Sequence, residues 1–282
     1  MHVAQTALGV QIKNLEDELG VALLERHSRG VRATPAGLLL NDYAAGILAQ
    51  VDEAKRAVKM RAGLAQETLR LGVTPSIVRL VGDVILTELA QMLTGATLHI
   101  VEDLSFVLMR QLEQGELSCA LCYSEDNSAH LHRTALLEED LFLMTSKEGA
   151  EGHGPIPFRE ALSRDLALTG QQDVVARILV DQARRIGTPL KVAYQVQSIR
   201  AVKNLVAKSV ASTVMPYGAA ESELRKGEFR ARLIVSPSVT RTLTLFTIRD
   251  RGHATLPHEF PSFIDAVVDR LCAADGPVMR RL

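Results

Sequence analysis

The feature that most constrains the fold is a regular alternation of strand-like and helix-like segments from residue 68 onward. Short apolar runs are each followed by a longer segment with apolar residues at helical spacing. The predicted strands cover 69–73, 97–101, 117–123, 166–168, 192–196, 211–215 and 242–248, and the predicted helices cover 74–93, 104–114, 174–186, 198–208 and 260–272. This alternation predicts a mainly parallel sheet covered by helices, which is an α/β fold.

The alternation occurs in two blocks of similar size, and the second block begins after the apolar run at 142–144. Two such units in one chain predict two lobes with a cleft between them. Parallel sheets place ligand sites at the carboxyl ends of their strands, so residues that follow a strand or begin a helix are candidates for lining the cleft. These candidates are Thr74, Pro75, Ser76, Glu102, Ser105, Cys122, Tyr123, Thr169, Gln197, Ser198 and Pro216.

The first of these candidates stand together at the start of a predicted helix, as Thr74-Pro75-Ser76. Free backbone N–H groups and the helix dipole at such a position favour a carboxylate or another anion. The same residues are also suited to capping the helix, which is the alternative interpretation. On these electrostatic grounds we expect a small, anionic ligand in the cleft.

The residues before 68 follow a different pattern. The first 20 residues predict one helix that ends at Gly20, and a basic turn with three arginines follows at 26–32. Thr34 and Pro35 then open a second helix. Its apolar residues recur at alternating spacings of four and three, as Leu40, Ala44, Ile47, Val51, Ala54 and Val58. This heptad pattern predicts a helix that pairs with a copy of itself, the alternative being a helix packed on its own domain.

Two stretches near the N-terminus resemble a known family. Residues 2–26 read HVAQTALGVQIKNLEDELGVALLER, and residues 29–37 read RGVRATPAG. The first closely resembles the second half of the winged helix-turn-helix of LysR-type transcription regulators, and the second resembles that family's wing and the start of its linker helix. The rest of the chain agrees with the family's layout at lower specificity.

The resemblance implies a partial winged helix-turn-helix DNA-binding domain at 1–34 and a linker (dimerisation) helix at 35–64. An effector-binding domain would follow at 68–282, with the two-lobed α/β fold of the periplasmic-binding-protein-like type 2 class. Lobe I would comprise about 68–144 and 249–282, and lobe II about 145–248. The implied partners are double-stranded operator DNA, a small-molecule effector and further copies of the chain, first as a homodimer through the linker helix and then as a homotetramer.

By the same resemblance, the first helix would be the recognition helix that enters the major groove. Its side chains would read base edges and contact phosphates, and the wing arginines would suit phosphate or minor-groove contacts. The implied DNA-binding residues are Gln5, Thr6, Val10, Lys13, Arg26, Arg29, Arg32 and Thr34. For the arginines, a solvated loop is the alternative.

This chain departs from the family pattern in three places. It has Ala4 where the family commonly has Ser, and Gly9-Val10 where Ser-Arg is common. The family also carries further residues before this point, which form two helices that support the recognition helix. We therefore expect the side chains of Leu8, Ile12 and Leu15 to be more exposed than in the complete domain. Each side chain that is fully exposed would cost about 1.5–3 kcal/mol of folding free energy. We expect this chain to bind DNA poorly, and a sensing and dimerisation module without DNA binding is the main alternative.

Other classes of function find little support in the sequence. A nucleophile elbow, a phosphate-binding loop, a dinucleotide-binding glycine motif and a metal-ligand set are all missing, so we expect neither enzyme activity nor a cofactor or metal. Cys119 and Cys122 form a C-x-x-C pair inside an apolar strand, where packing is the favoured interpretation. The chain shows no membrane span and no signal peptide, which favours the cytoplasm over the exported solute-binding proteins of similar fold.

Overall fold

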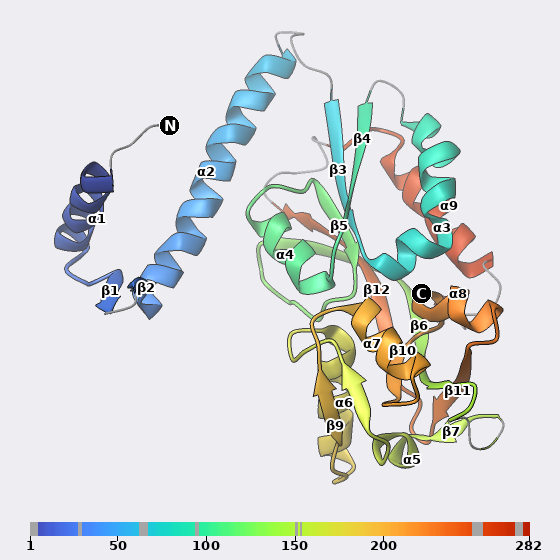
Figure 1. Ribbon diagram of the computed structural model, residues 1–282. Helices are drawn as coiled ribbons and strands as arrows, with labels where there is room; N and C mark the ends of the chain where they lie inside the picture. Colours follow the sequence, from blue (N-terminus) through green and yellow to red (C-terminus); the bar gives the residue numbers. More distant parts are fainter. Residues whose placement is uncertain are drawn as a thin grey trace. The chain divides into compact units, whose positions relative to one another are not determined.

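The computed structural model describes residues 5–27, 30–61, 67–93, 96–149, 152, 154–249, 256–273 and 279–282. The chain divides into two compact units, an N-terminal unit of residues 1–65 and a C-terminal unit that comprises nearly all of residues 66–282. Figure 1 shows the elements of each unit in order along the chain. The two units are described separately below.

The N-terminal unit is a helix, a two-stranded hairpin and a long second helix. Its elements are α1 (Gln5–Leu19), β1 (Leu24–His27), β2 (Gly30–Ala33) and α2 (Pro35–Arg61). Gly20 ends α1 in the left-handed region, at φ +69°. The start of α2 packs closely on the preceding turn, because a Cβ atom at Gly37 would stand 2.1 Å from the carbonyl oxygen of Leu23. Glycine at this position is therefore required by the close approach of two backbone segments.

The C-terminal unit contains a nine-stranded mixed sheet with helices packed on it. The first part of the unit consists of β3 (Glu67–Val73), α3 (Pro75–Thr87), the short 3-10 helix η1 (Leu89–Met92), β4 (Ala96–Glu102), α4 (Ser105–Glu113), β5 (Cys119–Cys122) and β6 (Leu131–Ser146). The next part consists of β7 (Ile156–Pro157), α5 (Phe158–Leu162), β8 (Leu166–Leu168), α6 (Val174–Arg185), β9 (Val192–Gln195) and α7 (Ile199–Ala207). The last part consists of β10 (Thr213–Pro216), α8 (Tyr217–Arg225), β11 (Phe229–Val235), β12 (Thr240–Ile248), α9 (Phe260–Ala273) and β13 (Met279–Arg281).

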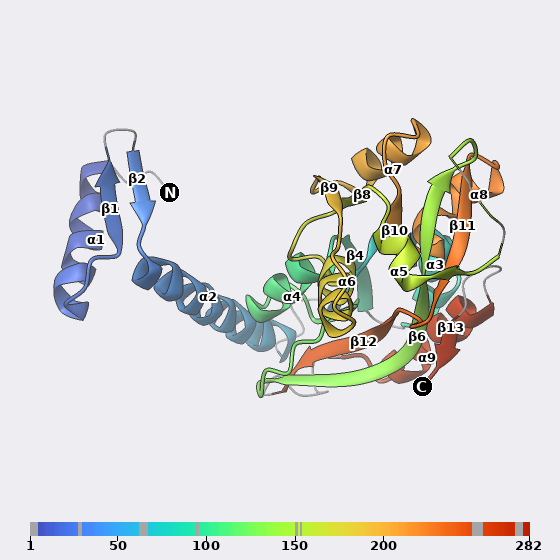
Figure 2. The same cartoon turned by 90° about the horizontal axis from the view of Figure 1, so that it is seen from below.

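The sheet runs continuously through both lobes in the order β4-β3-β5-β12-β6-β11-β7, and β10 and β13 also pair with β6. In the first lobe β3, β4 and β5 are parallel, as the alternation of strands and helices predicts. The strand β6 is 16 residues long, and it pairs with β12 over its first part and with β10 and β11 over its second. Figure 2 shows β6 as a long curved ribbon beside β12. These two antiparallel strands connect the lobes.

The core of the first lobe forms on the central strand β3. Leu69, Leu71 and Val73 have no exposed surface, and they pack with residues of α3 and α9. The other face of β3 is covered as well, because a Cβ atom at Gly72 would stand 2.6 Å from the side chain of Leu117. Burial on both faces is typical of a strand inside a parallel sheet, and it explains why the segment is apolar without a polar face.

The secondary structure agrees with the sequence-based elements at most positions. The predicted strand 166–168 matches β8, and the predicted helix 174–186 corresponds to α6. Two differences bear on the site. The run at 142–144 is only a part near the end of the long β6, and β12 begins at Thr240, two residues before the prediction. The exact domain and lobe boundaries stay a prediction.

Candidate functional site: a cavity between the two lobes

A small cavity of about 60 Å³ lies where strand ends and helix starts of both lobes meet. The residues that line it are Thr74, Pro75, Ser76, Leu104 and Ser105 from the first lobe, Leu168, Thr169, Asp173, Val174, Val175, Ile199, Val202, Thr213, Val214, Met215, Pro216 and Ala219 from the second, and Arg241 from β12. Most of these side chains are apolar. The starts of α3, α4 and α6 therefore converge on one largely apolar space, as expected for ligand sites at the ends of parallel strands.

The predicted effector contacts fall into three groups. The structure brings six of them together in the cavity wall: Thr74, Pro75, Ser76, Ser105, Thr169 and Pro216. Glu102, Gln197 and Ser198 line a larger opening of about 650 Å³ next to it, which shares Pro75, Leu104 and Ile199 with the cavity. Cys122 and Tyr123 line neither space. For the residues of the first two groups, the role as effector contacts stays a prediction.

The expectation that Cys122 contacts an effector is corrected by its position. It has no exposed surface and packs in an apolar cluster with Leu108 and Phe246. Burial raises the pKa of the Cys122 thiol to about 12, and it raises the pKa of the Cys119 thiol as well. Both thiols therefore stay protonated at neutral pH and act as core residues.

The start of α3 keeps its first turn open toward the cavity. Thr74 occupies the N-cap position in an extended conformation, but its side chain makes no capping hydrogen bond. Its hydroxyl instead lies 3.3 Å from the hydroxyl of Ser76. Side-chain capping, the alternative interpretation of these residues, is therefore not what Thr74 does. By contrast, Ser198 caps α7 by accepting from the N–H of Ala201 at 3.3 Å.

The charged residues of the wall were not among the residues predicted from sequence. Arg241 on β12 stands directly opposite Glu139 on β6. Its Nε donates to Oε2 of Glu139 at 2.7 Å, its Nη2 lies 2.7 Å from the same oxygen in an ion pair, and Nη2 donates to Oγ of Ser76 at 2.9 Å. Glu139 has no exposed surface and Arg241 is 8% exposed. Arg241 therefore reaches the cavity wall as one partner of a buried, hydrogen-bonded ion pair.

The ring of Tyr123 packs against the guanidinium of Arg241. The guanidinium carbon of Arg241 lies 3.5 Å from the centre of the Tyr123 ring, which is a cation–π contact. Burial raises the pKa of the Tyr123 hydroxyl well above its ordinary value, so the ring stays neutral. The role of Tyr123 as a direct effector contact is corrected, because the ring supports Arg241 and does not reach the cavity.

Arg241 keeps its charge in spite of its burial. Burial alone would lower the pKa of the guanidinium, but the carboxylates of Glu139 and Asp173 raise it, so that the pKa lies above its ordinary value. Asp173 reaches the wall as the N-cap of α6, where it accepts from the N–H of Val175 at 2.9 Å. The wall thus holds a permanent cation between two carboxylates.

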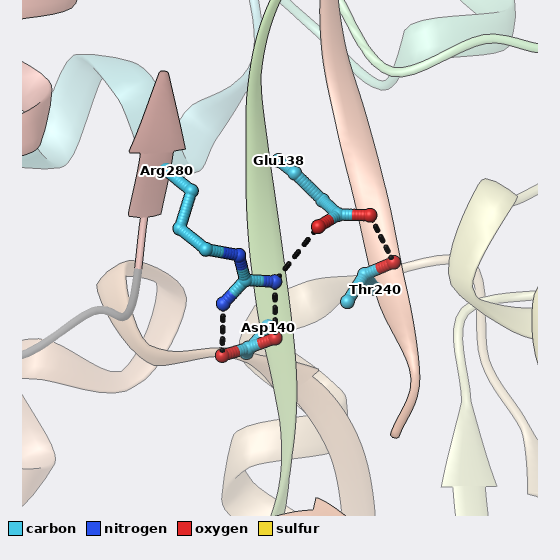
Figure 3. A network of polar contacts seen from close by, with 4 residues as sticks. All are labelled: Glu138, Asp140, Thr240 and Arg280. Atoms are coloured by element: carbon cyan, nitrogen blue, oxygen red, sulfur yellow. Dashed lines mark hydrogen bonds and ion pairs between the residues drawn. The ribbon is translucent and has the colours of Figure 1, made fainter. Parts of the chain in front are cut away.

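The neighbours of Glu139 on β6 point the other way. Glu138 and Asp140 bind Arg280 of β13, which donates to Asp140 at 2.9 and 3.0 Å and to Glu138 at 2.8 Å. Thr240 adds a hydrogen bond to Glu138 at 3.0 Å. Figure 3 shows this network. Because side chains alternate across a strand, the three consecutive acidic residues of β6 bind two different arginines on its two faces.

The predicted DNA contacts lie in the N-terminal unit. Val10 is 57% exposed on α1, and Lys13 and Arg32 are exposed as well. Thr34 is corrected: it is 8% exposed, donates to the carbonyl of Ala22 at 2.8 Å and accepts from the N–H of Gly37 at 3.0 Å, so its hydroxyl caps α2. The side chains of Gln5, Thr6 and Arg26, and all of Arg29, lie outside the described residues.

Comparison with known protein families decides the assignment. Residues 1–38 match the family model of the bacterial regulatory helix-turn-helix proteins of the LysR family, and residues 62–271 match the model of the LysR substrate binding domain. The chain belongs to the LysR family of transcription regulators. This LysR regulator therefore combines a DNA-binding helix-turn-helix with an effector-binding domain, and the family, the fold class and the type of function expected from the sequence are confirmed.

Related proteins match over most of their length. The regulator BbuR of Bordetella bronchiseptica is 26% identical over 88% of this chain and 76% of its own length. The Escherichia coli dual regulator OxyR is 26% identical, over 86% and 80%, and the E. coli nitrogen assimilation regulatory protein Nac is 28% identical, over 87% and 80%.

Solved structures share the fold. A full-length OxyR variant of Pseudomonas aeruginosa aligns with a TM-score of 0.60 and 22% identity, over 97% of this chain and 87% of that one. CbnR in complex with its target DNA aligns with a TM-score of 0.61 and 18% identity, over 95% and 91%.

Within the described segments, no helix combines the length and apolar character needed to span a membrane.

Proposed function

We propose that this LysR regulator binds double-stranded operator DNA through α1 and the β1–β2 wing, and that a small molecule bound between the lobes controls this binding. The observation that carries the proposal is the cavity itself, because residues at strand ends and helix starts of both lobes line it together with Arg241 of the connecting strand β12. A ligand there would change the equilibrium between lobe arrangements only if it bound one arrangement more tightly than the other.

The DNA contacts are proposed for the exposed residues of the N-terminal unit. We propose that the exposed side chains of Lys13 on α1 and Arg32 on β2 contact phosphates and that the exposed Val10 contacts base edges. Gln5, Thr6, Arg26 and Arg29 remain part of the proposed set. That CbnR binds its target DNA through the same fold supports double-stranded DNA as the partner.

Self-association is proposed for α2. The predicted heptad residues Ile47, Val51 and Val58 are 60%, 45% and 71% exposed, and Ala54 is exposed as well, whereas Leu40 and Ala44 are partly buried. A long helix with several exposed apolar side chains in heptad register favours pairing with a second copy. We therefore propose a homodimer through α2 and, by likeness to the family, a homotetramer.

The effector is proposed to bind reversibly. Several relatives are hydrogen peroxide-inducible genes activators by name. Peroxide oxidises thiolates, but Cys119 and Cys122 are buried with raised pKa values, and Cys272 is exposed on α9, away from the cavity wall. These positions favour a ligand that binds without covalent chemistry. We further propose that the protein acts in the cytoplasm, by binding and not by catalysis.

The test is a fluorescence anisotropy titration of the full chain with the DNA that lies upstream of its own gene, at low salt because we expect this chain to bind DNA weakly. The double variant Lys13→Gln/Arg32→Gln should bind this DNA more weakly, with a slope of log affinity against log salt that is smaller by roughly two. The control Lys208→Gln/Arg230→Gln removes the same charge from exposed positions of the second lobe and should bind as the native chain does.

Two results would contradict the proposal. Equal loss of affinity in both double variants would indicate a general charge effect without a DNA-binding surface. A folded native chain that does not bind the DNA would favour the alternative, a sensing and dimerisation module that acts without DNA or a solute-binding protein.

A further inference from the structure

Arg241 carries a donor group for which the described residues provide no acceptor. Arg241 has five N–H groups, and those on Nε and Nη2 bind Glu139 and Ser76. Its Nη1 makes no hydrogen bond to any residue in the part of the chain that the structure describes, and it is not among the sealed, unpartnered polar atoms. Nη1 therefore keeps some exposed surface although Arg241 is 92% buried, and we infer that this surface faces the cavity that Arg241 lines.

The guanidinium is held from three sides. Glu139 binds one edge, Ser76 lies 2.9 Å from Nη2, and the ring of Tyr123 covers one face. A guanidinium is planar, so these contacts also determine where the two N–H groups of Nη1 point. The donor is therefore oriented before a ligand binds, and little conformational entropy is lost on binding.

The apolar side chains in the rest of the wall favour a ligand with a hydrocarbon body. Its other side chains include Leu104, Leu168, Val175, Ile199 and Met215. Among the polar groups of the wall, the hydroxyl of Ser76 and the uncapped first turn of α3 favour an oxygen acceptor. A suitable ligand therefore has an apolar body and one oxygen-acceptor end.

We propose that Arg241 is the specificity-determining contact of the effector site, and that its Nη1 donates to the carboxylate of a small monocarboxylic acid with a hydrocarbon body. This rests on the proposed function, because it names the class of effector for the same cavity. Ser76 binds the same carboxylate from the side of α3. Glu139 keeps Arg241 in place, and thus acts as a positioning residue.

Asp173 limits the charge of the ligand. Its carboxylate lies in the wall and interacts with Arg241, while Glu139 already neutralises much of the guanidinium from behind. A second carboxylate on the ligand would meet Asp173 with no further cation in the wall among the described residues. The site thus fits one negative charge and disfavours two.

The test uses three probes with the same branched skeleton: isovalerate, isoamyl alcohol and isoamylamine. Their binding to the full-length chain is measured by ligand-observed NMR at millimolar concentration. The native chain should bind isovalerate about tenfold more tightly than the alcohol and should not bind the amine. Asp173→Asn, which keeps an N-capping side chain, should increase the affinity for isovalerate several-fold and leave that for the alcohol unchanged.

Arg241 is tested together with its partner, so that no buried charge is left unpaired. In Glu139→Leu/Arg241→Met the preference for isovalerate over the alcohol should disappear. The control Arg281→Met removes an arginine that binds Asp265 and Asp269 on α9 and should leave the preference unchanged. If the double variant does not fold, Glu139→Gln gives an independent test, because the guanidinium is then no longer neutralised and isovalerate should bind more tightly.

Three outcomes would overturn the inference: equal or tighter binding of the amine or the alcohol by the native chain, an unchanged preference in the double variant, or binding of no probe by a chain that still binds the upstream DNA. The last outcome leaves the proposed regulator intact and removes only the effector class. If the probes behave as expected but the DNA is not bound, the inference stands and the proposed function fails.

Discussion

Replacing Arg241 alone by methionine should destabilise the C-terminal unit severely. The substitution removes the hydrogen bond and the ion pair to Oε2 of Glu139 and the cation above Tyr123. Methionine is long and apolar, so it fills most of the vacated space without restoring any donor. The carboxylate of Glu139 has no exposed surface, and water cannot solvate it in the folded chain. The main effect is thus an uncompensated buried charge.

The expected loss is about 3–5 kcal/mol, which is the usual cost of removing one partner from a buried ion pair. The contact with Tyr123 adds about 1 kcal/mol at most, because part of its area is filled again by methionine. For a unit of this size, the loss corresponds to a decrease in Tm of roughly 6–20 °C. By contrast, Glu139→Leu/Arg241→Met removes both charges and should lie within about 1–2 kcal/mol of the native chain.

The assay is urea unfolding followed by far-UV circular dichroism, since the chain contains no tryptophan. The native chain, both single variants and the double variant form a double-mutant cycle, and we expect a coupling free energy of several kcal/mol between Glu139 and Arg241. A loss below about 1 kcal/mol in Arg241→Met, or a double variant as unstable as the single one, would refute the reasoning. The first result would mean that water reaches Glu139, and the second would mean that lost packing, and not the buried charge, causes the instability.

Four further predictions concern other parts of the chain. Ser76→Phe should fill the cavity and abolish probe binding in the NMR assay, while analytical ultracentrifugation shows unchanged self-association. Ile47→Asp should have the opposite effect, since it places a charge in the α2 seam, and should shift the protein toward monomer without affecting probe binding. Hydrogen bonds from Arg280 and Thr240 lower the pKa of Glu138 below its ordinary 4.5. The Glu138 carboxylate therefore contributes stability above about pH 4.5 and loses this contribution as the pH falls through the lowered pKa. In acid unfolding curves, the difference in stability between the native chain and Arg280→Met should shrink below that pH. Iodoacetamide should modify only Cys272 in the folded chain, as measured by peptide mass spectrometry, and modification of either β5 cysteine without denaturant would contradict their burial.

The parts of the fold that were predictable from sequence depend on local patterns. The strand 166–168 and the start of α3 at Pro75 follow from an apolar run and from a proline at the first helical position. Six cavity residues were also found, because they stand directly after strands or at helix starts. In each case, the signal lies within a few consecutive residues.

The residues that were missed depend on partners far away in the sequence. Arg241 and Glu139 are 102 residues apart, and neither sequence neighbourhood indicates that the two side chains form an ion pair. Glu139 stands between two other acidic residues, a pattern that usually marks a solvated surface. A weaker signal did exist. Arg241 directly precedes a strongly β-prone run, so extending that strand by two residues would have placed an arginine inside the sheet.

The presence of this ion pair in the wall is itself informative about function. Apolar residues of similar volume would stabilise the strands as well or better, because desolvation of two charges cancels much of their attraction. Stability alone therefore does not account for Glu139 and Arg241. What the pair provides is a fixed cation with a free N–H edge in an apolar cavity, which isolated hydrocarbon side chains cannot provide. If the double variant proves as stable as the native chain but does not distinguish the acid from the alcohol, recognition and not folding is the role of the pair.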